Sequence, residues 1–224
     1  MIDLDVRIDP AAEALVPGVR LGLLTGRVEV RGRSNALEAE VADRVRTLRA
    51  LIADRPVAEL PGVAAVRRAF KAFGKDPSRY RGSPEALLRR IAQGKGLYAV
   101  SNVVDAMNLA SLETLHPLGL YDARFVTPPV TFRPGRAGES YAGIAKGDIN
   151  LEGLPVLADA GGPFGNPSSD SARAMVRGDT DEILLVVFAF PGSDDPGAAL
   201  GAATRALTVH AGLRAARTAV VAAE

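Results

Sequence analysis

Residues 81–122 read RGSPEALLRRIAQGKGLYAVSNVVDAMNLASLETLHPLGLYD. Ser83-Pro84-Glu85 is a strong helix start, because a hydroxyl can cap free backbone N–H groups, proline tolerates the first turn, and an acidic side chain suits the positive helix end. Gly94 is a typical helix stop. The stretch therefore predicts a short helix, a glycine turn and a second helix around residues 103–112.

Three polar residues of the second helix, Asn102, Asp105 and Asn108, follow each other at i, i+3 and i+6. This spacing places them along one side of a helix. They are interpreted as one wall of a pocket that binds an amino group or a ribose. The alternative is that they cap the helix and hold the protein together by internal hydrogen bonds.

Short apolar segments on either side of this stretch predict strands. Leu4, Val6 and Ile8 alternate with charged residues, as in a half-buried strand. Residues 183–190 are apolar without alternation, which predicts a central strand buried on both faces. Further short strands are predicted at residues 19–24, 28–30, 125–126, 130–132, 141–144 and 156–157.

Helices are predicted by apolar residues at helical spacing. One begins at Ser34 or Asn35 and ends before Pro56, a second begins at Pro61, and the alanine-rich residues 198–223 predict a terminal helix. Strands and helices mix without a regular βαβ rhythm. The fold class expected from this order is α+β.

Composition excludes several function classes. The chain has 27 Lys plus Arg and 26 Asp plus Glu, so a dedicated nucleic-acid binder with a large basic excess, including a DNA binder, is not expected. Cysteine is absent and the two histidines lack metal-binding spacing, so we expect no metal and no cofactor. Without a signal peptide or a membrane-spanning apolar run, a cytoplasmic protein with no membrane partner is expected.

A local basic cluster is the exception to this balanced charge. It is interpreted as an RNA-phosphate contact surface, or alternatively as a solvated helix face. Its members are Lys75, Arg79, Arg81, Arg89, Arg90 and Lys95.

The order of motifs in residues 81–122 resembles the B3/B4 (editing, tRNA-binding) module of the phenylalanyl-tRNA synthetase β subunit, here freestanding. The matching pieces are Ser83 to Ile91, Gly94 to Leu97, Asn102 to Asn108, Leu112-Glu113 and Pro117 to Asp122. The resemblance implies β-sheets packed in an unusual sandwich with surrounding helices. It divides the chain into N-terminal strands and a helix (1–60), the module (61–190) and a C-terminal helix (191–224), together forming one compact unit.

This chain departs from the family pattern at its pocket. The family's histidine falls on Gly119, its glutamate falls on Val186, and a Gly-Gly turn corresponds roughly to Asp170-Ser171. The resemblance therefore implies a pocket whose chemistry differs from tyrosine editing.

The turn-rich loop of residues 161–171 is the candidate for that pocket, facing the 102–108 helix. Its glycines let backbone approach a ligand, and free N–H groups can hold an oxyanion. Catalytic roles are assigned to Asp170, which binds an α-amino group, to Ser171, which positions water, and to His116, which orients water or an ester. Substrate contacts are assigned to Gly161, Gly162 and Asn166 as well as to Asn102, Asp105 and Asn108. The alternatives are a surface turn with local hydrogen bonds and, for the histidine, a helix-end cation.

Two function classes follow. One is a hydrolase that removes the amino acid from mischarged aminoacyl-tRNA by water attack on the ester. The other is a non-catalytic module that binds an amino acid or RNA. The expected partners are accordingly tRNA and an amino acid or aminoacyl ester; a small-molecule amidase or esterase is a third and weaker possibility.

Overall fold

The computed structural model describes residues 5–223, and its architecture is α+β, as predicted. Within that range, sheet I has the order β10 (Arg214–Ala222), β2 (Arg20–Arg27), β9 (Glu182–Ala189), β3 (Leu118–Asp122). Sheet II has the order β1 (Val6–Ile8), β4 (Val130–Pro134), β7 (Pro155–Asp159), β8 (Gly162–Gly165). A hairpin joins β5 (Ser140–Ala142) and β6 (Asp148–Asn150).

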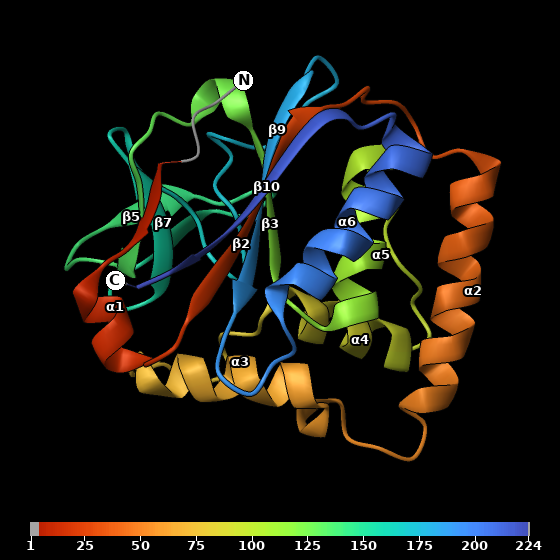
Figure 1. Ribbon diagram of the computed structural model, residues 1–224. Coiled ribbons are helices and arrows are strands. Elements are labelled where there is room, and N and C mark those ends of the chain that lie inside the picture. Colours follow the sequence, from red (N-terminus) through yellow and green to blue (C-terminus); the bar gives the residue numbers. More distant parts are fainter. Residues whose placement is uncertain (1–4, 224) are drawn as a thin grey trace.

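The helices gather mainly on the side of sheet I that faces away from sheet II (Figure 1). They are α2 (Asn35–Leu51), α4 (Ser83–Ala92), α5 (Asn102–Thr114) and α6 (Pro196–Ala211). Three elements complete the main fold: α1 (Pro10–Leu15), α3 (Pro61–Ala72), which lies below sheet I, and the 3₁₀ turn η1 (Val57–Glu59).

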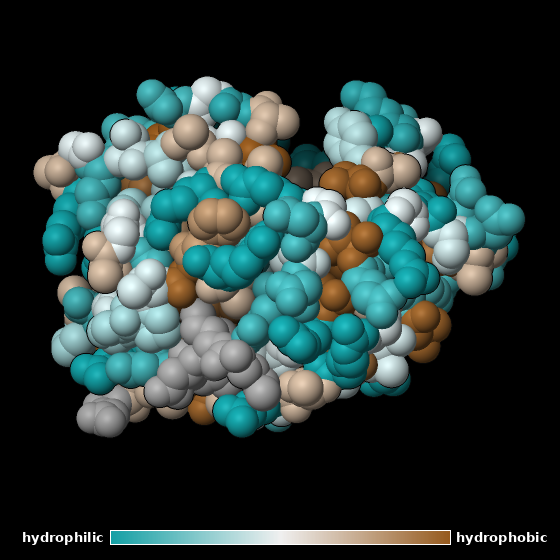
Figure 2. Space-filling view, turned by 90° about the horizontal axis from the view of Figure 1, so that it is seen from above, coloured by the Kyte–Doolittle hydropathy of each residue, from teal (hydrophilic) through white to brown (hydrophobic). Residues whose placement is uncertain are grey.

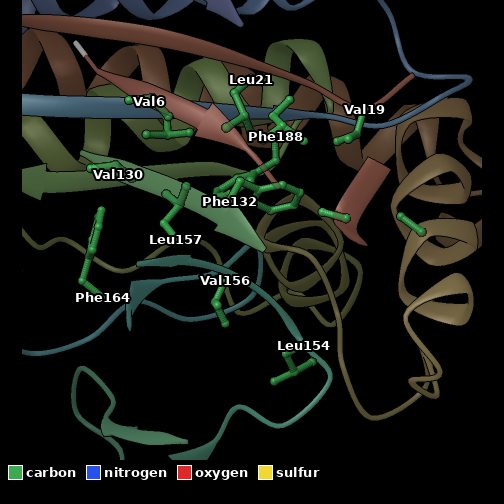
Figure 3. Close-up of a cluster of buried hydrophobic side chains, with 14 of the residues drawn as sticks. Val6, Val19, Leu21, Val130, Phe132, Leu154, Val156, Leu157, Phe164 and Phe188 are labelled. Atoms are coloured by element: carbon green, nitrogen blue, oxygen red, sulfur yellow. The ribbon is translucent and has the colours of Figure 1, made fainter. Parts of the chain in front are cut away.

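Strand β9 is the centre of sheet I, as its apolar sequence predicted. It lies between β2 and β3, and every residue from Ile183 to Phe190 is at most 3% exposed. Alternate side chains enter two cores: Leu184, Val186 and Phe188 face sheet II, while Ile183, Leu185 and Val187 face α5 and α6. Figure 3 shows Phe188 beside Phe132 of sheet II, with ring centres 6.0 Å apart. A strand covered on both faces has no polar side, which explains the absence of alternation.

Local helix signals were accurate for three helices. Ser34 caps α2 by accepting a hydrogen bond from the N–H of Leu37, α3 begins at Pro61, and the backbone turns at Gly94 with φ of 71° after α4. Strand β1 confirms the alternation at Val6 and Ile8, whereas Leu4 lies outside the described residues.

The prediction of two strands over residues 19–30 is wrong. A single strand, β2, continues through Thr25-Gly26, and residues 28–30 leave the sheet. Thr25 is fully buried and pairs with Leu184, while a Cβ on Gly26 would lie 2.6 Å from Leu213. The glycine is therefore required by close packing and not by a turn.

The predicted terminal helix over residues 198–223 is wrong in its second half. Helix α6 ends at Ala211, Gly212 adopts a left-handed φ of 61°, and β10 then runs antiparallel to β2. Hydrogen bonding to β2 overrides the helix preference of the alanines, and the β-branched Thr218, Val220 and Val221 suit a strand.

Smaller corrections concern turns. The strand predicted at residues 125–126 is absent, because residues 123–125 form a 3₁₀ turn, η2 (Ala123–Phe125). The loop predicted at residues 161–171 contains a short strand, β8. Ser83 does not cap α4: Gly82 is the N-cap residue, and the Ser83 hydroxyl has no hydrogen-bond partner among residues 5–223. The division of the chain at residues 60 and 190 stays a prediction.

Glu85 should be a main stabiliser of the α3–α4 pair. Its carboxylate is 1% exposed and lies 2.9 Å from Arg67 of α3 and 2.9 Å from Arg89. Glu85→Gln should lower the free energy of unfolding by about 3–5 kcal/mol, because it leaves partly buried arginines without their anion. Chemical denaturation measures this change.

Glu113 is the matched control, since its carboxylate also bridges two arginines but is 39% exposed. Glu113→Gln should cost less than about 1 kcal/mol, because exposed ion pairs contribute little. Equal losses for the two variants would contradict the role given to Glu85.

Candidate functional site

Asp170 is held by the hydroxyl of Tyr121, at 2.8 Å from Oδ1. Burial raises the pKa of Asp170 to about 7, while hydrogen bonds from Tyr121 and from the backbone of Asn166 and Leu120 act in the opposite direction. Burial and the nearby Asp170 raise the pKa of the fully buried Tyr121 far above its ordinary value. The carboxyl predicted to bind a substrate ammonium is therefore already engaged within the protein.

The side chain of Tyr121 fills the space around Gly119 and Gly165. A Cβ built on Gly119 would lie 2.1 Å from the Tyr121 hydroxyl oxygen, and one on Gly165 would lie 2.0 Å from it. Gly119 pairs with Val186 across β3 and β9. Gly119 and Val186, onto which the resemblance places the family's histidine and glutamate, are thus neighbours here, and the ring of Tyr121 fills the space beside Gly119.

Asn166 organises the loop that follows β8. Its Nδ2 donates to the Tyr141 hydroxyl at 2.8 Å, and its Oδ1 accepts from the backbone N–H groups of Ser168 and Ser169 at 2.8 and 2.9 Å. Ser171 accepts a hydrogen bond from the N–H of Arg173 at 3.1 Å. These contacts form a locally satisfied turn, which was the alternative interpretation of this loop.

Gly161 lies in the turn between β7 and β8, and Gly162 is the first residue of β8. The N–H of Gly161 donates to Asp159 at 2.8 Å, and Arg173 donates to the Gly162 carbonyl oxygen at 3.1 Å. The Gly161 N–H group considered for oxyanion binding is therefore used inside its own turn.

His116 lies away from Asp170. Its ring is fully buried, with Nε2 3.1 Å from the Asp194 carbonyl oxygen, and burial lowers its pKa. Tyr121, the partner of Asp170, follows His116 by five residues, most of which belong to β3. Five residues of extended strand span roughly 16 Å, which separates the histidine from Asp170. The structure does not assemble His116, Asp170 and Ser171 into one constellation.

The predicted pocket wall on α5 also has a different role. Asn102 accepts from the N–H of Arg31 at 2.7 Å and donates to the carbonyl oxygens of Glu29 and His210 at 2.9 and 2.8 Å. Asp105 is 1% exposed and pairs with Arg33 at 2.8 Å. These side chains anchor residues 29–33 to the helix layer.

Helix α5 and the 161–171 loop lie on opposite faces of sheet I. The buried residues of α5 that contact the sheet share a core with α6, whereas Phe164 of the loop lies in the core between the two sheets. Asn108 is a half-buried residue of α5 and therefore lies on the same side of sheet I as Asn102 and Asp105. The expectation that this loop faces the 102–108 helix is therefore corrected.

The basic cluster flanks both ends of α4, and we call it the α4 basic surface. One group precedes the helix: Lys75, Arg79 and Arg81. The other group lies at its C-terminal end: Arg89, Arg90 and Lys95. The helix has ten residues, so the groups are separated by about 15 Å. Arg79, Arg81 and Lys95 are exposed, and Arg89 pairs with Glu85.

Tyr98, which is not among the residues predicted above, belongs to this surface. Its side chain is 64% exposed, and the Arg90 guanidinium lies 3.6 Å from its ring centre. The sequence signal for this residue was an aromatic side chain shortly after Lys95, in the segment that joins the basic residues to the next helix. Figure 2 shows hydrophilic residues over most of one face of the molecule, with hydrophobic residues exposed between them.

Two sheets packed face to face, with helices on the outer face of one of them and basic residues around α4, define an α+β module. The B3/4 domain family matches residues 65–206, and the chain belongs to this family. It is 27% identical over 135 residues to the phenylalanine–tRNA ligase beta subunit of Clostridium tetani (strain Massachusetts / E88), covering 57% of this chain and 16% of that subunit.

A solved structure gives a related comparison. An N-terminal fragment of the phenylalanyl-tRNA synthetase beta subunit from Pyrococcus horikoshii aligns with a TM-score of 0.48 and 15% identity, covering 97% of this chain and 51% of the fragment. Within residues 5–223, no three His, Cys, Asp or Glu side chains are grouped so as to hold a metal ion. Over the same residues, no helix has the length and apolar character needed to cross a membrane.

The close fit of Tyr121 predicts that Gly165→Ala destabilises the protein. The new methyl group would meet the buried hydroxyl and ring, and overpacking of this kind costs about 1–3 kcal/mol. Gly147→Ala is the control, because its Cβ would meet nothing within 4 Å. Thermal unfolding of both variants should show a lower melting temperature for Gly165→Ala only; equal melting temperatures would contradict the packing described here.

The raised pKa of Asp170 predicts that the free energy of unfolding depends on pH. Its pKa is about 7 in the folded protein against an ordinary value of 3.8. Between these values the folded state keeps a proton that the unfolded state has lost, so the free energy of unfolding falls as pH rises, by at most about 1.4 kcal/mol per pH unit.

The measurement compares the wild-type protein with Asp170→Asn, which cannot titrate at this position. The difference in free energy of unfolding, wild type minus variant, should fall from about pH 4 to about pH 7 and then level off. In Tyr121→Phe, loss of the hydrogen bond that lowers the Asp170 pKa should move the upper limit of this change to higher pH. A difference that does not vary with pH would contradict the assignment.

Proposed function

We propose that this protein binds tRNA through the α4 basic surface. The observation that carries the proposal is the exposure of Arg79, Arg81 and Lys95 at the two ends of α4, in a chain whose net charge is only +1. Because opposite charges nearly cancel over the whole chain, a local group of exposed cations is the part best suited to phosphates. Membership of the B3/4 family and similarity to a phenylalanine–tRNA ligase subunit support this partner.

The interior supports binding more than catalysis. Asp170, Ser171 and His116 do not meet, and the side-chain groups of Asn102, Asp105 and Asn166 are used in internal hydrogen bonds. The non-catalytic alternative therefore fits the structure better than a hydrolase with this trio. We also propose that the protein acts in the cytoplasm and that DNA is not its partner.

Hydrolysis of an aminoacyl-tRNA ester is a second candidate, favoured by one observation. A carboxyl whose pKa is about 7, as for Asp170, can act as a general base near neutral pH. It would have to exchange its bond with Tyr121 for one with a water near the ester. The test is a panel of aminoacyl-tRNAs with the protein and with Asp170→Asn; acceleration of ester loss by the wild type alone would support this candidate.

The tRNA proposal predicts a salt-dependent affinity that depends on the α4 basic surface. Replacing Lys75, Arg79 and Arg81 together by Gln should weaken binding to all tRNAs and reduce the slope of log affinity against log salt by about one for each lost phosphate contact. Binding is measured with purified tRNA over a series of salt concentrations.

A matched control removes the same charge elsewhere, by replacing Arg27, Arg214 and Arg217 of β2 and β10 with Gln. These residues are exposed, and the control variant should bind as the wild type does. Equal weakening by both triple variants would mean that net charge, and not this surface, determines binding.

A further inference from the structure

Tyr98 is presented to solvent by a loop that is firmly held. Arg33 donates to the Tyr98 carbonyl oxygen at 2.6 Å and also pairs with the buried Asp105 of α5 at 2.8 Å. Gly94 and Gly96, with φ of 71° and 62°, shape the turn before it. The exposed ring therefore rests on a backbone fixed to the helix layer.

The two faces of the Tyr98 ring have different environments. The Arg90 guanidinium lies 3.6 Å from the ring centre and covers one face. Tyr98 as a residue is nevertheless 64% exposed, which leaves the face of the ring opposite Arg90 accessible to solvent. A flat aromatic surface supported from behind by a guanidinium can accept another flat ring on its open side.

Two further cations lie at the glycine turn that precedes this ring. Lys95 is exposed three residues after the end of α4, and a guanidinium nitrogen of Arg49 lies 4.0 Å from the Cβ position of Gly94. Arg49 belongs to the exposed last turn of α2. Arg90 thus covers the ring itself, while Lys95 and Arg49 add positive charge at the turn that leads to it.

We propose that Tyr98 is a stacking platform for an unpaired nucleobase of the bound RNA, with Lys95 and Arg49 near the adjoining phosphates. This inference rests on the proposed tRNA binding and specifies how part of the ligand is held. A nucleotide combines a planar base with a phosphate, which matches an open aromatic face beside cations. Such stacking tolerates any base sequence, because every base has a π-face.

The experiment uses the full chain and three RNA probes: deacylated tRNA, a short single-stranded RNA and a blunt RNA duplex. Tyr98→Ala should weaken binding of tRNA and the single strand by roughly 5- to 150-fold, the range expected for loss of one base-aromatic stack. Binding of the blunt duplex should not change. The salt slope should also stay constant, because no charge is removed.

Further variants separate stacking from other roles. Tyr98→Phe keeps the ring and should bind as the wild type does, whereas Tyr98→Leu keeps apolar bulk under Arg90 and should weaken binding as alanine does. Tyr98→Leu also provides the test where alanine perturbs folding, which thermal unfolding checks. Lys95→Gln should instead lower the salt slope by about one.

Three results would overturn the inference: wild-type affinity in both Tyr98→Ala and Tyr98→Leu, equal loss in Tyr98→Phe, or equal loss on the blunt duplex. If the Lys75, Arg79 and Arg81 variant still weakens tRNA binding in those cases, the proposed function stands without the stacking platform. Absence of tRNA binding by the wild type at low salt would overturn both.

Discussion

Burial of β9 on both of its faces is the constraint on which the rest of the structure depends. Its side chains alternate between a core shared with sheet II and a core shared with α5 and α6. Neither core is complete without this strand, and its neighbours β2 and β3 must present apolar residues on the same two faces. The position of β2 in turn determines where the C-terminal segment adds as β10, because β2 offers it a free edge.

The same arrangement accounts for the closed interior. Tyr121 of β3 points into the core between the sheets, where Gly119 and Gly165 leave room for its hydroxyl and Asp170 receives its hydrogen bond. A phenol, a carboxyl and two glycines therefore complete a packed core at the place where the resembling family has ionisable side chains. Tyr121 can occupy this place only because neither glycine carries a Cβ.

Arginine serves two distinct purposes in this protein. Arg67 and Arg33 are paired with carboxylates that are 1% exposed, and they join helices and loops to each other. Arg79 and Arg81 are exposed beside the start of α4, and Arg90 is stacked on an exposed ring. The first group stabilises the fold and holds the loop that carries Tyr98; in the second group, Arg79 and Arg81 are the exposed residues that we propose contact phosphates. Counting basic residues along the chain does not separate these groups, because Arg89 and Arg90 are adjacent yet differ in their partners.

The sequence by itself determined the features that depend on neighbouring residues. It placed the cap of α2 at Ser34 or Asn35, the start of α3 at Pro61 and the turn at Gly94, since each is set within one or two helical turns. It also predicted β9, because a strand buried on both faces is apolar without alternation. It also identified the α4 basic surface, which is local in sequence. Only the tertiary structure decided that the alanines after Gly212 form a strand, that Asn102 and Asp105 anchor residues 29–33, and that Asp170 belongs to Tyr121. Each of these rests on partners tens of residues to about two hundred residues away, and a hydrogen bond or strand pairing over such a separation leaves no periodic pattern in the chain.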